Sequence, residues 1–140
     1  MKLQKAARFG LYAVLELARD PQRHLSVGEI ADKYSVSTNH LAKVLRILGR
    51  AGFVESVRGA GGGYRFVGNP RRVTLLDIIK LFEDVGTSLS NRPEPGDNTD
   101  IGRGLRVVLT EIDEISLATL KSITLTTLVS LAARGKRAIN

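Results

Sequence analysis

Residues 57–66 (VRGAGGGYRF) combine four glycines with two arginines, a composition suited to binding phosphate. Glycine lets another molecule approach the backbone because it has no Cβ, and arginine binds phosphate oxygens through a planar fork of donors. The stretch does not match the motifs with which proteins bind small nucleotides. A Walker loop needs Lys and then Ser or Thr after its last glycine, and the dinucleotide-binding motif needs a third glycine at the position of Tyr64. The stretch therefore favours the phosphates of a nucleic acid, and the alternative is a flexible hairpin turn without a ligand.

The sequence has no pattern of residues suited to catalysis or metal binding. It contains no cysteine, which excludes disulfides, thiolate metal sites and thiol chemistry. His24 and His40 lie far from other ligand-type residues, and neither has an acidic residue at helical spacing that would orient it as a base. The acidic pairs at 83–84 and 113–114 are adjacent residues, so they point to different helix faces. We predict that the protein is not an enzyme and has no cofactor.

The positive charge is confined to the first half of the chain. Residues 1–72 contain 13 Lys or Arg against 5 Asp or Glu, whereas residues 73–140 contain 8 against 9. A basic half-chain suits a polyanion, because each neutralised phosphate releases counterions. The alternative is that these residues form a basic, solvated surface that binds no polyanion. The 140 residues suit one domain. The apolar run near the amino terminus is interrupted by Glu16 and Arg19 and has the spacing of an amphipathic helix, so it predicts neither a signal peptide nor a membrane span. We expect a cytoplasmic protein at the nucleoid.

Two short helices joined by a three-residue turn are predicted after an amphipathic helix at 3–18. Ser26 and Glu29 match a capping box, which predicts a helix at about 27–34. The turn ends at Ser37, which can cap a second helix to about Gly49. That helix has an apolar face and an opposite polar and basic face, formed by Asn39, Ala42, Lys43, Arg46 and Arg50. The pattern is typical of a helix-turn-helix whose second helix reads DNA.

A hairpin is predicted directly after this second helix. The segments 53–58 and 64–67 have strand composition, and the glycines form the loop between them. A hairpin in this position is a wing, and Arg58 and Arg65 lie at its base. An arginine there can enter a minor groove, whose negative potential attracts it. A cap at Thr74 and Asp77 then predicts a helix to about Asp84.

The last third of the chain predicts a helix that pairs with another helix. Residues 86–100 are polar and rich in turn formers, which indicates a loop. A helix at about 101–120 follows, and its apolar residues are spaced 4, 3, 4 and 3 apart, as in a coiled-coil seam. These residues are Ile101, Leu105, Val108, Ile112 and Ile115. A short helix at 123–133 and a fraying basic tail are expected after it.

Five segments together resemble the Rrf-two family of bacterial winged-helix transcriptional regulators: 2–13 (KLQKAARFGLYA), 29–31 (EIA), the turn at 36–37, 57–65 (VRGAGGGYR) and 73–78 (VTLLDI). The resemblance covers nearly the whole chain. It implies a mainly α fold with a small β-hairpin, in which a winged helix-turn-helix domain (1–85) is joined by the loop 86–100 to a dimerisation helix and a C-terminal helix (101–140). It also implies a homodimer that binds a palindromic operator in double-stranded DNA and usually represses.

The resemblance also implies which residues act. The recognition helix, about 37–49, would enter the major groove, and Arg58 of the wing, about 53–67, would enter the minor groove. Dimerisation would use the five seam residues. The residues expected at the DNA are Ser37, Thr38, Asn39, His40, Lys43, Arg46, Arg58, Gly59, Gly61, Gly62 and Arg65.

The chain departs from the family pattern at two places. Some relatives carry a glutamate that tunes operator choice where this sequence has Ala42. Many relatives hold an iron–sulfur cluster with three cysteines in the loop before the dimer helix, here 86–104, and this chain has none. We therefore predict a member without a cysteine-held cluster, whose effector or protein partner the sequence does not identify. The alternative function is a protein-interaction module on a winged-helix scaffold, which reports metabolite status through a partner protein. The polar loop at 86–100, which lacks the family's ligands, is the reason for considering it.

Overall fold

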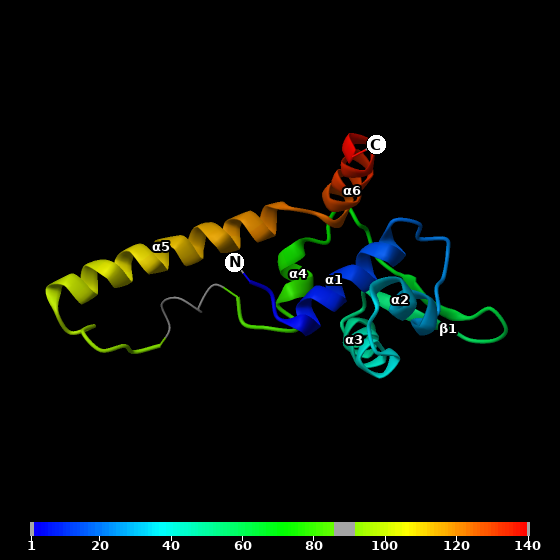
Figure 1. Ribbon diagram of the computed structural model, residues 1–140, viewed down its shortest axis with the longest axis horizontal. Helices are drawn as coiled ribbons and strands as arrows, with labels where there is room; N and C mark the ends of the chain where they lie inside the picture. The colour runs from blue at the N-terminus through cyan, green and yellow to red at the C-terminus, as the bar shows by residue number, and fades with distance from the viewer. Residues whose placement is uncertain (1, 86–91, 140) are drawn as a thin grey trace.

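The computed structural model describes residues 2–85 and 92–139, which form six helices and one short hairpin. In Figure 1 the hairpin projects from one end of the molecule and α5 extends from the opposite end. This mainly α fold with a two-stranded antiparallel sheet confirms the predicted fold class. In chain order the elements are α1 (Lys5–Ala18), α2 (Val27–Tyr34), α3 (Thr38–Arg50), β1 (Val54–Val57), β2 (Gly63–Phe66), α4 (Leu75–Ile79), α5 (Asp100–Ser122) and α6 (Leu125–Ile139).

Short polar side chains set the boundaries of the two helices α2 and α3. The Ser26 hydroxyl accepts the backbone N–H of Glu29 at 3.0 Å, and the Glu29 carboxylate accepts the N–H of Ser26 at 3.3 Å, a complete capping box. Ser35 adopts a left-handed φ of 54°, which ends α2. The Ser37 hydroxyl then accepts the N–H of His40 and starts α3. A three-residue turn therefore separates the two helices.

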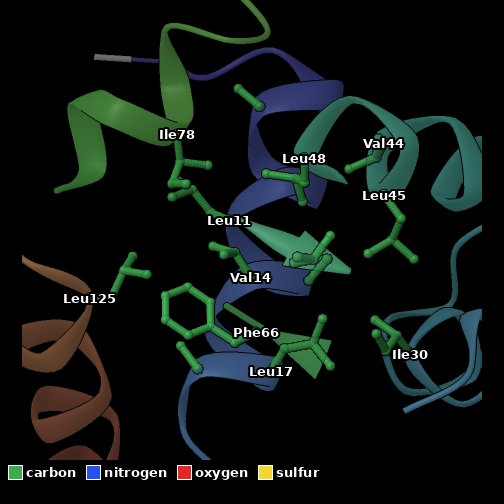
Figure 2. Close-up of a cluster of buried hydrophobic side chains, with 14 of the residues drawn as sticks. Leu11, Val14, Leu17, Ile30, Val44, Leu45, Leu48, Phe66, Ile78 and Leu125 are labelled. Carbon is green, nitrogen blue, oxygen red and sulfur yellow. The ribbon is translucent and has the colours of Figure 1, made fainter. Parts of the chain in front are cut away.

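The hydrophobic core is arranged around α1. Figure 2 shows Leu11, Val14 and Leu17 of α1 among side chains from α2, α3, β2 and α4. Leu120 and Leu125, at the end of α5 and the start of α6, are also buried in this core. The winged domain therefore needs the junction between α5 and α6 to complete its interior.

Backbone hydrogen bonds fix that junction to the segment that follows the wing. The N–H of Leu75 donates to the carbonyl of Ile123 at 2.9 Å, and the N–H of Leu125 donates to the carbonyl of Val73 at 2.9 Å. From this junction α5 extends away from the group of helices α1, α2, α3 and α4. Its amino-terminal end therefore lies far from the core in Figure 1. No helix in the described ranges is long and apolar enough to cross a membrane.

Two helices differ in length from the expectation. The helix predicted to about Asp84 ends at Ile79, because Leu81 and Phe82 bond to carbonyls three residues earlier and form turns. These turns bring the Phe82 ring onto α1, where a Cβ at Gly10 would lie 2.5 Å from ring atom Cε2. The last helix continues to Ile139 rather than ending near residue 133.

Candidate nucleic-acid interface

The outer face of α3 is polar and basic, while its inner face is buried in the core. Leu41, Val44, Leu45 and Leu48 are buried, as the helical spacing predicts. The exposed residues of the helix include Thr38, Asn39, Lys43, Arg46 and Arg50. Throughout residues 2–85 and 92–139, no side chain forms a hydrogen bond or ion pair with Lys43, Arg46 or Arg50. Three cations on one helix face therefore remain available to a polyanion.

His40 is half-buried. Its ring lies edge-on against the ring of Phe9 in α1, with 5.1 Å between centroids. The same contact places the amino-terminal half of α1 beside the start of α3. His40 therefore packs on the protein as well as bordering the exposed face.

The wing is larger than the hairpin that the sequence indicates. Strands β1 and β2 pair Val54 with Phe66 and Glu55 with Arg65. Leu25, before α2, adds a third segment: its N–H donates to the Tyr64 carbonyl at 2.9 Å, and the Tyr64 N–H donates back at 2.7 Å. Sequence reasoning missed Leu25, because a single bridging residue has no periodic pattern. The bridge fixes the base of the wing to the domain.

The glycines of the wing are required by its own backbone. Gly59 and Gly61 have φ values of 102° and 72°, which other residues rarely adopt. A Cβ at Gly62 would lie 2.2 Å from the Val57 carbonyl oxygen, and one at Gly63 would lie 2.3 Å from the Leu25 carbonyl oxygen. The run of glycines therefore folds the hairpin, in addition to any close approach to DNA.

The two wing arginines lie in different electrostatic surroundings. Arg65 donates from Nε to Glu55 Oε1 at 2.6 Å, and its Nη2 also contacts this carboxylate. The register of the hairpin places these two residues directly opposite each other. Arg58 is exposed, and it has no ion pair or hydrogen bond within the described part of the chain. Arg58 thus offers a full positive charge, whereas that of Arg65 is offset by Glu55.

A network of polar contacts links α1 to α2. The Tyr34 hydroxyl donates to Glu16 Oε1 at 2.5 Å, and Lys33 Nζ lies 2.7 Å from the same atom. Burial alone would raise the pKa of Glu16, but the hydrogen bonds from Lys33 and Tyr34 outweigh it and hold that pKa below its ordinary value. Burial and the same carboxylate raise the pKa of Tyr34. The two helices are therefore joined by a charged carboxylate and a neutral phenol.

The five predicted seam residues lie on the exposed surface of α5. The exposed fractions of Ile101, Leu105, Val108, Ile112 and Ile115 range from 43 to 80%. Large apolar side chains are normally removed from water, so a continuous exposed row indicates a surface for another molecule. This row is on the helix that extends away from the core (Figure 1).

The part of the predicted loop at 92–99 is folded onto the start of α5, and residues 86–91 lie outside the described residues. Asp97 accepts the N–H of Glu94 at 2.7 Å and lies 2.8 Å from the Arg106 guanidinium, and these contacts lower the pKa of Asp97. Gly102 is needed here, because a Cβ would overlap the Gly96 carbonyl. A cavity of about 300 Å³ lies between loop and helix. The residues that the structure describes contain no group of three His, Cys, Asp or Glu able to hold a metal.

Comparisons with known proteins agree with this geometry. The chain is 56% identical over 137 residues to a Rhodopseudomonas palustris protein assigned as the HTH-type transcriptional regulator BadM, covering 98% of this chain and 86% of that protein. It is 38% identical over 85 residues to the HTH-type transcriptional regulator NsrR of Bacillus subtilis, covering 60% of this chain and 58% of NsrR.

The fold is shared with solved regulators. The structure of CymR, described as the global cysteine regulator of B. subtilis, matches with a TM-score of 0.73 and 30% identity, covering 94% of this chain and 98% of CymR. The model of the Rrf2 family, described as "Iron-dependent Transcriptional regulator", matches residues 3–131. These relatives are regulators and not enzymes. This chain therefore belongs to the Rrf2 (Rrf-two) family of transcriptional regulators.

Proposed function

We propose that this regulator is a homodimer that binds a palindromic operator in double-stranded DNA and represses transcription. The observation that carries the proposal is the shared exposure of three cations, Lys43 and Arg46 on α3 and Arg58 at the wing, which have no ion pair among the residues that the structure describes. A helix with a basic face and a wing with an unpaired arginine suit a major groove and the adjacent minor groove. The protein would then act at the nucleoid in the cytoplasm.

The residues divide by the part of DNA that each can reach. Thr38, Asn39 and Lys43 belong to the first turns of α3, which in helix-turn-helix proteins contact base edges. Ser37, His40 and Arg46 are assigned to phosphates beside them. In the wing, Arg58 enters the minor groove and Gly59, Gly61 and Gly62 keep the backbone close to the sugar-phosphate chain. Arg65 supports the wing through Glu55 and contributes a weaker phosphate contact.

Residues 1–85 form the DNA-reading unit in this proposal, residues 86–100 the connection, and residues 101–140 the dimerisation unit. Pairing of the α5 seam with that of a second copy would bury the five apolar side chains. Two recognition helices related by a two-fold axis read two inverted half-sites, which is why the operator is palindromic.

The proposal is tested by selecting DNA with the purified protein from fragments of the source genome. Fluorescence anisotropy should then show that the selected fragment binds more tightly than a random duplex of equal length, by a factor of about 10³ or more. The affinity should fall steeply as salt is raised, because each phosphate contact releases counterions. Equal affinity for the two duplexes would contradict sequence-specific regulation.

A second candidate function rests on the cavity between loop and α5. Its lining combines apolar side chains with charged side chains of both signs: Pro95, Ile101, Leu105 and Leu109 with Arg92, Glu94, Asp97 and Arg106. A protein partner or effector bound there would fit the alternative of an interaction module. A stoichiometric protein retained from cell extract in the absence of DNA would favour that module, provided that the selected DNA does not compete with it.

Arg58→Ala should weaken binding to the selected fragment about tenfold, whereas Arg65→Ala should weaken it less than about fivefold. The reason is that Arg58 is unpaired, while the charge of Arg65 is already offset by Glu55. Anisotropy titrations at one fixed salt concentration measure both. Equal losses in the two variants would show that the ion pair does not distinguish the arginines.

A further inference from the structure

We propose that the DNA-binding surface extends from α3 onto the amino-terminal half of α1, where Lys5 and Arg8 bind the phosphates that flank the major groove. This inference rests on the proposed function, because it assigns two more contacts to the same DNA. Neither residue belongs to the helix-turn-helix or to the wing.

The first argument is the position of α1. The contact between the rings of Phe9 and His40, at 5.1 Å, joins the second turn of α1 to the first turn of α3. Tyr12 of the next turn stacks on Tyr34 at the end of α2, with 4.5 Å between ring centroids. This half of α1 therefore borders the end of α3 that would enter the groove (Figure 1). DNA seated on that end must pass its backbone close to α1.

The second argument is the direction of the side chains. Lys5, Arg8 and Tyr12 are spaced three and four residues apart, so they lie on one face of α1. Lys5 and Arg8 are exposed, whereas the opposite face, with Ala7 and Leu11, is buried in the core.

The third argument is charge. No acidic residue occurs before Glu16, and that carboxylate is bound by Lys33 and Tyr34. At the start of α1 the Glu83 carboxylate accepts the N–H of Gln4 at 2.8 Å. In the described ranges neither Lys5 nor Arg8 has an acidic partner, so both charges are free to bind a polyanion.

The fourth argument is the preorganisation of Arg8. Its Nη1 donates to the Tyr12 hydroxyl at 3.3 Å, and Tyr12 is held by its stack on Tyr34. Guanidinium has five N–H donors, so this single bond leaves the others for phosphate oxygens. The bond holds the side chain near one orientation, which lowers the entropy lost on binding.

The test compares Arg8→Gln and Lys5→Gln with Lys121→Gln, which removes one exposed charge near the end of α5. Kd is measured by anisotropy at several salt concentrations for two probes, the fragment selected from the genome and a random duplex of the same length. For Arg8→Gln and for Lys5→Gln, the steepness of log K against log salt should fall by about 1.8 on both probes, because each of the two subunits in the proposed dimer loses one phosphate contact worth about 0.9, and Lys121→Gln should keep the full slope. Matching circular dichroism spectra confirm that each variant is folded.

The outcomes separate this inference from the proposed function. Unchanged slopes in both α1 variants, with an unmodified protein that prefers the selected fragment, overturn the inference alone. A loss confined to the selected fragment also overturns it, because phosphate contacts do not depend on sequence. An unmodified protein without preference for the selected fragment contradicts the proposed function. If that protein binds neither duplex, both proposals are overturned.

Discussion

Replacing Leu105 and Ile112 together with aspartate is expected to produce a monomer that binds the operator about 10²–10⁴ times more weakly than the unmodified protein. Both side chains belong to the exposed seam of α5, with exposed fractions of 58 and 43%. In a dimer they would face the partner helix, where aspartates would be desolvated and would repel one another. A monomer loses the second half-site contact, which in a dimer is made at high effective concentration. Analytical ultracentrifugation measures the mass, and anisotropy measures the affinity.

The matched control changes two residues of the same helix that lie off the seam. Val107 and Thr110 are exposed, and Val107→Asp with Thr110→Asp adds the same two charges to α5. This variant should remain a dimer with nearly unchanged affinity for the operator. Dissociation of both double variants would mean that added charge alone separates the subunits. A seam variant that stays dimeric would place the dimer contact elsewhere.

Gly63→Ala is expected to lower the free energy of unfolding by about 3 kcal/mol, from overpacking together with weakened hydrogen bonds. The new Cβ would lie 2.3 Å from the Leu25 carbonyl oxygen, and backbone cannot move aside as a flexible side chain can. Relief of the clash must disturb the two hydrogen bonds between Leu25 and Tyr64. Urea unfolding, followed by circular dichroism at one protein concentration, measures the change.

Gly49→Ala is the control for this prediction. The Cβ added at Gly49 would lie 3.7 Å from the Val54 carbonyl oxygen, an ordinary contact. Gly49 is within α3, so alanine should raise the free energy of unfolding by about 0.5–1 kcal/mol through its higher helix propensity. The two glycine substitutions should thus have opposite signs. Equal stability of Gly63→Ala and the unmodified protein would contradict the structural role of Gly63.

Local patterns were enough to predict most elements of the winged domain. The capping residues Ser26 and Ser37 accept N–H groups three residues further along the chain, so sequence alone places the starts of α2 and α3. The apolar seam of α5 was likewise predictable, because helical spacing determines which residues share a face. The end of α4 was not, because the turn around Phe82 depends on the space above Gly10 in another helix.

The candidate site divides in the same way. The sequence predicted the basic face of α3 and the position of the wing, and the family resemblance singled out Arg58 for the minor groove, but nothing in the sequence indicated that Arg65 is held in an ion pair. The cross-strand register pairs Arg65 with Glu55 and leaves Arg58 unpaired. The nearness of Lys5 and Arg8 to α3 also depends on the contact between Phe9 and His40, which are far apart in the chain.

The sequence by itself determined the helix-turn-helix, the glycine-rich wing, the seam of α5 and the absence of thiolate ligands. The helices, the wing and the seam follow from caps and periodicity, which act within a few residues, and the absence of thiolate ligands follows from a sequence without cysteine. Only the tertiary structure decided that Leu25 completes the wing, that Leu120 and Leu125 complete the core, and that Arg58 keeps its charge unpaired. Each of these depends on segments far apart in the chain, whose meeting is set by packing around α1 and not by the residues next to them.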